Sequence, residues 1–176
     1  MLDPESNYEI FPVRGEFAVF SNKGEGLKTN GLNIYPTPCG IWPNGEKASV
    51  SLSEFKELYK QKKVIKTVGV HLTPTFDLEG NISNEVIIGP AQVGNIDRED
   101  FRSKYTEKDY LDSVKSFFPN LRLEDIRLHQ TGIQAKLKDH SDFVINKGKN
   151  YINLIGIDSP GLTSCLAIAK YVKKLL

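Results

Sequence analysis

The sequence contains few of the residues that bind soft metals. Its 176 residues include two cysteines, three histidines and one methionine. Cys39 and Cys165 lie far apart and form neither a CxxC pair nor the ligand spacing of a zinc site. The sequence therefore predicts no metal site. Two isolated cysteines are typical of buried thiols in a reducing compartment, so we expect a cytoplasmic protein.

An excess of one charge and long apolar runs are also lacking. The chain has 23 Lys and Arg against 22 Asp and Glu, a formal net charge of +1, which gives no argument for a nucleic-acid partner or an acidic membrane surface. Its apolar runs are far shorter than the ~20 residues of a membrane-spanning helix. No basic region followed by an apolar stretch marks a signal peptide. We therefore expect one globular domain, or a large part of one, without an integral membrane segment.

Short segments with strand character dominate the chain. They are rich in β-branched and aromatic residues, and turn-forming residues separate them. The sequence predicts strands at 16–21 and 32–38, two strands within 64–90 joined by a turn at 78–81, a strand at 124–137 and a hairpin at 142–157.

Helices are predicted at three places. Ser51 and Glu54 have the spacing of a capping box, within an insertion at about 41–66. Thr106 can cap a second helix, and the last helix is predicted to start at Pro160 and to run to the end. That last helix is apolar nearly all round, so we expect it to pack against further protein. The order of elements favours an α+β fold with a mostly antiparallel sheet over a βαβ series.

The segment GIDSPGLTS, residues 156–164, joins an apolar strand to the last helix. One hypothesis is a nucleophilic Ser159 in a hydrolase, which would need the pattern G-x-S-x-G. Gly156 lies one residue too far before the serine, and no His, Asp or Glu follows it. Both mismatches disfavour the hydrolase.

A second hypothesis for the same segment is an anion-binding helix start. Ser159 is a good N-cap and Pro160 suits the first helical position. Gly161 permits close approach to the backbone, and the free N–H groups of Gly161, Leu162 and Thr163 would then face an anion at the positive end of the helix. An ordinary capped helix that binds nothing stays an alternative.

Six stretches of the chain together resemble one family. They are RGEFAVF (14–20), IYPTP (34–38), GVHLTPTFDLEGNISNEVIIGP (69–90), TGIQAKL (131–137), DFVI (142–145) and INLIGIDSPGLTSCLAIAKYV (152–172). In this order they resemble the FAD-dependent oxidoreductases of the D-amino-acid-oxidase and glycerol-3-phosphate dehydrogenase type, with the L-2-hydroxyglutarate dehydrogenase/oxidase branch as the nearest. The resemblance implies hydride transfer to FAD from a small 2-hydroxy acid, an amino acid or a polyol phosphate.

The resemblance also implies a domain organisation. Residues 1–150 correspond to an antiparallel substrate-binding domain, and residues 151–176 to a strand and helix that return to the FAD domain. The dinucleotide-binding pattern G-x-G-x-x-G of the family is missing. The chain therefore resembles the C-terminal portion of such an enzyme, and we expect that alone it does not retain FAD. The FAD-binding half would then be a partner.

Several site residues follow from the resemblance. The turn from Ser159 to Thr163 (Ser159, Pro160, Gly161, Leu162 and Thr163) would contact FAD mainly through its backbone, where a helix dipole stabilises the negative charge of reduced flavin. His71 would bind substrate or accept its hydroxyl proton, with Thr73 on the same strand face and Tyr35 lining the same cavity. An ordinary hydrogen-bonded histidine is the alternative for His71.

The sequence offers fewer residues that could bind the carboxylate end of the substrate. Gln134 stands where the family commonly has an arginine, so the usual bidentate clamp is replaced by a group without charge. Lys136, two residues on and on the same strand face, can compensate, or it can be a solvated lysine. The competing class of function is a non-enzymatic module of the same fold that binds a ligand or partner.

Overall fold

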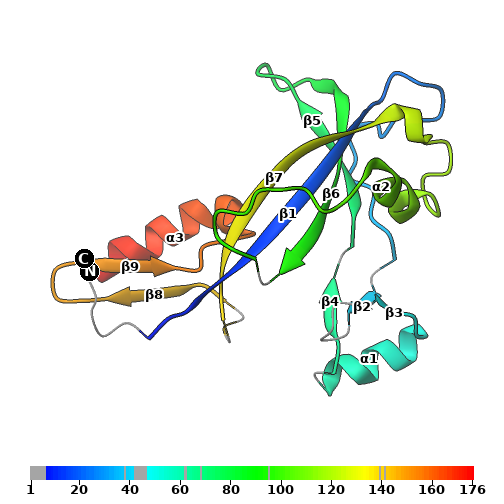
Figure 1. The fold of residues 1–176 in the computed structure, drawn as a ribbon. Helices are drawn as coiled ribbons and strands as arrows, with labels where there is room; N and C mark the ends of the chain where they lie inside the picture. The colour runs from blue at the N-terminus through cyan, green and yellow to red at the C-terminus, as the bar shows by residue number, and fades with distance from the viewer. Residues whose placement is uncertain are drawn as a thin grey trace. The chain divides into compact units, whose positions relative to one another are not determined.

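The computed structural model describes residues 7–37, 39–41, 47–61, 63–67, 69–94, 96–138, 140 and 142–176 (Figure 1). In chain order its elements are β1 (Ile10–Ser21), β2 (Cys39–Ile41), β3 (Lys47–Ala48), α1 (Leu52–Lys60), β4 (Ile65–Thr67), β5 (His71–Phe76), β6 (Ile82–Gly94), α2 (Glu107–Val114), the short 3-10 helix η1 (Leu123–Asp125), β7 (Ile126–Leu137), β8 (Val144–Lys147), β9 (Ile152–Ile155) and α3 (Gly161–Leu175). Helices and mainly antiparallel strands confirm the predicted α+β class.

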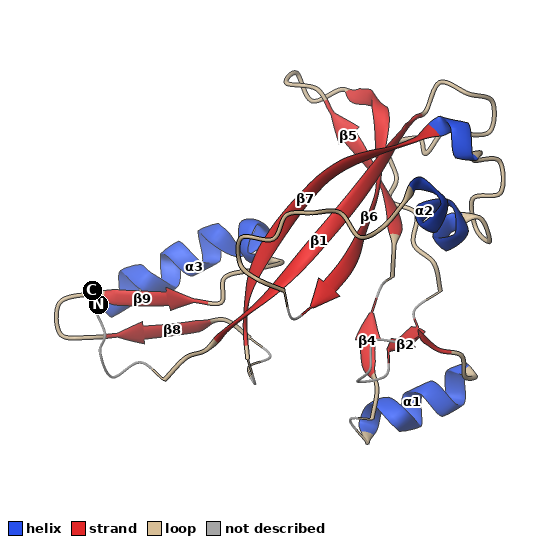
Figure 2. Cartoon of the chain, in the orientation of Figure 1, coloured by secondary structure: helices blue, strands red, loops and turns tan. Residues whose placement is uncertain are grey.

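The largest sheet has four strands in the order β5-β6-β1-β7 (Figure 2). Strands β5 and β6 form an antiparallel hairpin, as predicted. Its turn is closed by Asp77, whose backbone N–H donates to the carbonyl of Asn81 at 2.9 Å and whose carboxylate accepts from the Asn81 N–H at 2.7 Å. An Asp that bonds the backbone a few residues on is a common way to stabilise such a turn.

The main hydrophobic core lies between this sheet and α2. Tyr110 and Val114, one helical turn apart on α2, are almost fully buried and pack with residues of β1, β5 and β6. The helix begins as predicted at Thr106, whose N–H donates to the carboxylate of Asp109 at 2.8 Å. An amphipathic stripe and a capping box therefore place α2 on the sheet.

The predicted insertion forms a small layer of its own. Strands β3, β2 and β4 make a three-stranded antiparallel sheet, and Phe55 of α1 is buried with Ala48 and Val64. Ser51 caps α1 by accepting from the backbone N–H of Glu54 at 3.2 Å, which confirms the predicted start. Residues 42–46 and 62 lie outside the described part of the chain.

Two predictions for local structure were wrong. The strand predicted at 32–38 is reduced to one isolated bridge at Ile34. Pro36 has no N–H and so offers one donor fewer for a ladder; Pro38 is not among the described residues. The thiol of Cys165, predicted to be buried, is exposed on α3. It lies between Leu162 and Leu166, which are 87% and 76% exposed. The side chain of Cys39 is not described.

The chain divides into two compact units. One contains residues 1–14, 92–101 and 132–176, and the other contains residues 15–91 and 102–131. The division falls inside β1, β6 and β7. The boundary at residue 150 that the resemblance implies stays a prediction.

Within the described residues, no helix has both the length and the apolar character of a membrane span. The same residues contain no group of three or more His, Cys, Asp or Glu side chains placed to hold a metal ion.

Candidate functional site

Two predicted site residues meet at the isolated bridge. The N–H of Ile34 donates to the carbonyl of Leu72 at 3.0 Å, and the N–H of Leu72 donates back at 2.9 Å. Because the two segments are antiparallel, the residue after Ile34 lies beside the residue before Leu72. These residues are Tyr35 and His71, whose rings stack with centroids 4.5 Å apart and planes 27° apart.

The imidazole of His71 stacks on Tyr35 with one face and also has a polar contact at one ring nitrogen. Its Nδ1 lies 3.1 Å from the carbonyl oxygen of Gly69. The side chain is half-buried at the start of β5. Among the described residues, none forms a hydrogen bond with Nε2 of His71. That nitrogen is the part of the ring left for a ligand.

The alternation predicted for β5 is confirmed. Thr73 and Thr75 are half-buried like His71, while Leu72 and Pro74 between them are buried. His71, Thr73 and Thr75 therefore share one face of the strand. The hydroxyl of Thr75 donates to the carbonyl of Glu85 on β6 at 2.8 Å.

Asn33 is a neighbour that sequence reasoning missed. Its side-chain amide donates to the phenolic oxygen of Tyr35 at 3.2 Å. The antiparallel register of the bridge also places Asn33 beside Thr73. The only signal in the sequence was its spacing of two residues from Tyr35, which puts both on one face of an extended segment.

The predicted anion-binding turn lies in the other unit and begins differently from the prediction. Pro160, not Ser159, occupies the N-cap position of α3, with φ −98° and ψ 45°. The N–H of Gly161 donates to the carbonyl of Asp158, so it is not free as predicted. The chain enters the helix through this tight turn, which leaves no extended N-cap for the serine hydroxyl to use.

Two of the three predicted N–H donors are nevertheless available. Within the described part of the chain, the N–H groups of Leu162 and Thr163 donate no hydrogen bond. The Thr163 hydroxyl donates to the carbonyl of Pro160 at 2.9 Å. Gly161 is buried, and a Cβ there would lie 2.6 Å from Cγ2 of Ile157. Glycine lets the turn pack this closely, and a larger residue would require Ile157 to shift.

Lys136 on β7 is connected to the same turn. Its Nζ lies 3.9 Å from Oδ2 of Asp158, with the Lys136 side chain 37% exposed. The pair brings a predicted substrate-binding residue next to the predicted cofactor-binding turn. Asp158 was missed by sequence reasoning because a lone acidic residue in a turn has no distinctive pattern. Gln134, two residues earlier on β7, has a buried Oε1 without a hydrogen-bond partner among the described residues.

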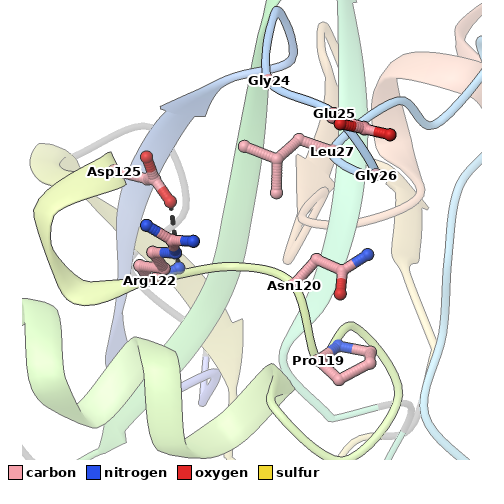
Figure 3. A pocket seen from close by; sticks show the side chains of 8 residues that line it. All are labelled: Gly24, Glu25, Gly26, Leu27, Pro119, Asn120, Arg122 and Asp125. Carbon is pink, nitrogen blue, oxygen red and sulfur yellow. Dashed lines mark hydrogen bonds between the residues drawn. The ribbon is translucent and has the colours of Figure 1, made fainter.

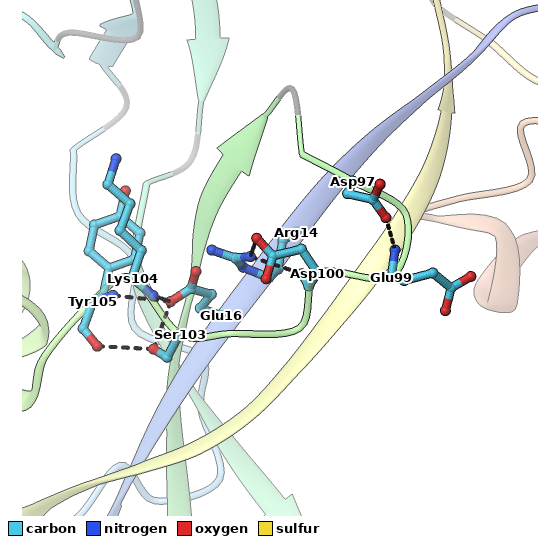
Figure 4. A network of polar contacts seen from close by, with 8 residues as sticks. All are labelled: Arg14, Glu16, Asp97, Glu99, Asp100, Ser103, Lys104 and Tyr105. Carbon is cyan, nitrogen blue, oxygen red and sulfur yellow. Dashed lines mark hydrogen bonds and ion pairs between the residues drawn. The ribbon is translucent and has the colours of Figure 1, made fainter.

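The motif RGEF contains a buried carboxylate that sequence reasoning also missed (Figure 4). Glu16 is 0% exposed. Its Oε2 accepts three hydrogen bonds: from the Ser103 hydroxyl at 2.8 Å, the Lys104 N–H at 2.8 Å and the Tyr105 N–H at 3.1 Å. Burial and the nearby charge of Glu16 raise the pKa of the Tyr105 phenol. Glu16 anchors the segment that leads into α2.

Arg14 belongs to the same motif but lies in the other unit, and its contacts also hold the fold together. Its guanidinium is buried and donates to the Asp100 carbonyl at 2.8 Å, with the Asp100 carboxylate at 3.2 Å. A buried arginine with both contacts satisfies its charge within the protein. We assign both charged residues of the motif to holding the fold.

One unit also contains a hollow of about 860 Å³ (Figure 3). It is lined by Gly24, Glu25, Gly26, Leu27, Pro119, Asn120, Arg122 and Asp125. The carboxylate of Asp125 accepts from the backbone N–H of Arg122 at 3.0 Å, which stabilises the wall of the hollow. None of the predicted site residues lines it.

Comparison with known proteins establishes the family. The model of the FAD-dependent oxidoreductase family (DAO) matches residues 1–175. The chain therefore belongs to the FAD-dependent oxidoreductases, which confirms the resemblance seen in its motifs.

Two characterised relatives match parts of the chain. Glycerol 3-phosphate oxidase of Mycoplasma genitalium is 36% identical over 106 residues, which cover 56% of this chain and 26% of that protein. Mitochondrial L-2-hydroxyglutarate dehydrogenase of Arabidopsis thaliana is 35% identical over 68 residues, covering 34% of this chain and 14% of that protein. The chain thus matches about a quarter or less of these relatives.

A solved structure has the same fold. It is L-alpha-glycerophosphate oxidase from Mycoplasma pneumoniae, dithionite-reduced and with FAD bound. The TM-score is 0.60 at 20% identity, and the similarity covers 97% of this chain and 37% of that one. Nearly all of the present fold therefore has a counterpart in a larger flavoprotein.

Proposed function

We propose that this chain forms the substrate-domain part of an FAD-dependent oxidoreductase that oxidises a small 2-hydroxy acid or a polyol phosphate. The observation that carries the proposal is the half-buried His71, stacked on Tyr35, with Thr73 on the same strand face. A half-buried histidine with one unpaired nitrogen is suited to accept a hydroxyl proton. The relatives named above act on compounds of these two classes.

The start of α3 fits the cofactor. FAD, when bound, accepts hydride and then carries negative charge on its pyrimidine ring. The unpaired N–H groups of Leu162 and Thr163 lie at the positive end of a helix, where an anion is stabilised. Ser159, Pro160 and Gly161 would shape the turn that presents these groups.

Gln134 and Lys136 are the candidates for the acidic end of the substrate. Gln134 can donate hydrogen bonds from the N–H groups of its side-chain amide, and Lys136 offers a positive charge. Asp158 holds Lys136 loosely, since 3.9 Å is the outer limit of an ion pair. A substrate carboxylate or phosphate can therefore compete for the ammonium group at little cost.

The test is reduction of FAD in the complete protein, in which an FAD-binding domain accompanies this chain. Glycerol 3-phosphate or L-2-hydroxyglutarate, mixed without oxygen, is expected to bleach the visible absorption of the flavin. His71→Asn is expected to slow this bleaching by 10²–10⁴-fold, the usual contribution of a general base. An unchanged rate in the variant would remove His71 from the chemistry, and no bleaching by any 2-hydroxy acid or polyol phosphate would refute the proposed activity.

The alternative is a non-enzymatic module that binds a partner. It is favoured by the exposed apolar face of α3, where Leu162 and Leu166 are 87% and 76% exposed. In the enzyme proposal, an FAD-binding domain covers this face.

Dialysis of the purified chain against buffer after adding FAD is the first measurement, and we expect a colourless protein. Retained flavin would mean that this chain alone makes a sufficient cofactor site. A cytoplasmic location also stays part of the proposal.

A further inference from the structure

The contact between His71 and Gly69 determines which ring nitrogen carries hydrogen. The oxygen 3.1 Å from Nδ1 belongs to a backbone carbonyl, which can only accept. The hydrogen bond therefore requires a hydrogen on Nδ1. In a neutral imidazole the other nitrogen, Nε2, then has a free lone pair.

We propose that the Gly69 carbonyl and the Tyr35 ring are positioning groups that hold neutral His71 as the Nδ1–H tautomer, with Nε2 as the proton acceptor. The role of Nε2 in proton transfer rests on the proposed function. The tautomer itself does not, because it follows from a contact within the chain.

Tyr35 restricts rotation of the imidazole. With ring centroids 4.5 Å apart and planes only 27° apart, the phenol covers one face of the imidazole. A partial turn about the Cβ–Cγ bond would break the stack. A half-turn would keep the ring plane but would put a carbon where Nδ1 now meets the carbonyl. Tyr35 is itself held by the Asn33 amide at 3.2 Å and by the backbone bridge at Ile34. Residues 33–35 thus hold the plane of the imidazole, and the Gly69 carbonyl selects one of the two ring orientations within that plane.

Gly69 is suited to present its carbonyl in this direction. Its φ is +69°, a conformation that residues with a side chain rarely adopt. A Cβ at this position would also lie 3.1 Å from Cγ of Pro36. Another residue would therefore have to rotate the backbone, and the carbonyl would turn away from Nδ1.

The tautomer has a defined consequence for proton transfer. A substrate hydroxyl donates its hydrogen bond to Nε2. As oxidation proceeds, the O–H bond breaks, an N–H bond forms at Nε2 and the imidazole becomes imidazolium. The electron pair of the O–H bond would stay on oxygen and form the new C=O bond, and FAD, when bound as in the proposed function, would supply the acceptor for the hydride. The Nε2–H then donates to the carbonyl oxygen of the product.

The experiment is long-range ¹H–¹⁵N NMR of the chain labelled with ¹⁵N-histidine. It is recorded about two pH units above the ordinary histidine pKa of about 6.5, where imidazoles are neutral. His71→Asn removes the signals of His71 and so assigns them, and the exposed His129 is an internal reference. We expect Nδ1 of His71 to be protonated and Nε2 to be unprotonated. A protonated Nε2, or the averaged pattern of a free histidine, would overturn the proposal.

Two variants at position 35 separate positioning from general folding. Tyr35→Phe keeps the ring that stacks and loses only the phenolic oxygen, so it is expected to keep the tautomer. Tyr35→Leu loses the stack and is expected to give a mixture of tautomers with the rest of the spectrum unchanged. A pure Nδ1–H tautomer in the folded Tyr35→Leu protein would show that the ring has no positioning role.

The tautomer and the proposed function fail in distinguishable ways. An Nδ1–H tautomer together with unchanged FAD reduction in His71→Asn would leave the inference on the tautomer intact and refute the catalytic role. Slowed FAD reduction together with an Nε2–H tautomer would support a role for His71 in the reaction and refute the assignment of its nitrogens.

Discussion

Replacing Glu16 by alanine is expected to lower the free energy of unfolding by about 3–5 kcal/mol. The carboxylate is 0% exposed and accepts three hydrogen bonds, two of them from backbone N–H groups of the segment before α2. A hydrogen bond to a charged group contributes roughly 1.5–3 kcal/mol, and a donor left without an acceptor costs more when it is buried. Lys104 and Ser103 are at the surface, so water can replace part of the loss. The expected value therefore lies at or below the lower end of the simple sum over three hydrogen bonds, which is about 4.5 kcal/mol.

Two further substitutions make this prediction specific. Glu16→Gln keeps the shape and one acceptor oxygen but loses the charge, so we expect a smaller loss of about 1–3 kcal/mol because neutral hydrogen bonds are roughly half as strong. Glu124→Ala removes an exposed carboxylate that lies 3.8 Å from Arg122, and a change within about 0.5 kcal/mol is expected.

Urea unfolding followed by circular dichroism measures these differences. The slope of the free energy against urea concentration is compared first, since equal slopes are needed to interpret a shifted midpoint as a change in stability. Equal midpoints for Glu16→Ala and Glu124→Ala would refute the reasoning. In that case the segment before α2 would not depend on the buried carboxylate.

Three other substitutions test separate parts of the structure. Gly161→Ala puts a Cβ 2.6 Å from a neighbouring side chain and is expected to cost about 1–3 kcal/mol in urea unfolding, whereas Gly132→Ala meets nothing within 4 Å and is expected to be nearly neutral. Hydrogen bonds from the backbone and hydroxyl of Thr106 lower the pKa of Asp109 in the folded protein. The Asp109 carboxylate therefore stabilises the fold above the unfolded-state pKa of about 3.9, and this contribution is lost as the pH falls through the lower folded-state pKa. Asp109→Asn is therefore expected to flatten the acid dependence of the unfolding midpoint, and an unchanged dependence would contradict this. Lys136→Met is expected to raise severalfold the substrate concentration needed for half-maximal FAD reduction. Because the Lys136 side chain is 37% exposed, the free energy of unfolding is expected to change by less than about 1 kcal/mol. An unchanged substrate dependence would exclude Lys136 from the acidic end of the site.

Much of the local structure could be predicted because it depends on contacts between residues that are close together in the sequence. The starts of α1 and α2 depend on Ser51 with Glu54 and on Thr106 with Asp109, contacts that span three residues each. The hairpin turn before β6 depends in the same way on a short polar segment. These interactions compete only with water and with other local arrangements, so residue type and spacing are enough to indicate them.

Two other predictions were less complete. Ser159 was predicted as the N-cap of α3, but the carbonyl of Asp158 accepts from the N–H of Gly161, and Gly161 packs closely against Ile157, a local arrangement that the residue types alone do not indicate. The charged residues of RGEF read as part of a family motif, whereas burial and partners far along the chain give Glu16 its structural role. Residue type alone contains no information on whether a carboxylate will be enclosed.

The sequence by itself determined the family and the order of most strands and helices, and it offered candidate residues for a flavin-linked site. Only the tertiary structure decided that Tyr35 stacks on His71 and that the Gly69 carbonyl faces Nδ1. The stack depends on the register of one bridge between Ile34 and Leu72, segments far apart in the chain. Shifting that pairing by one residue would turn the two rings to opposite faces, because side chains alternate along extended backbone.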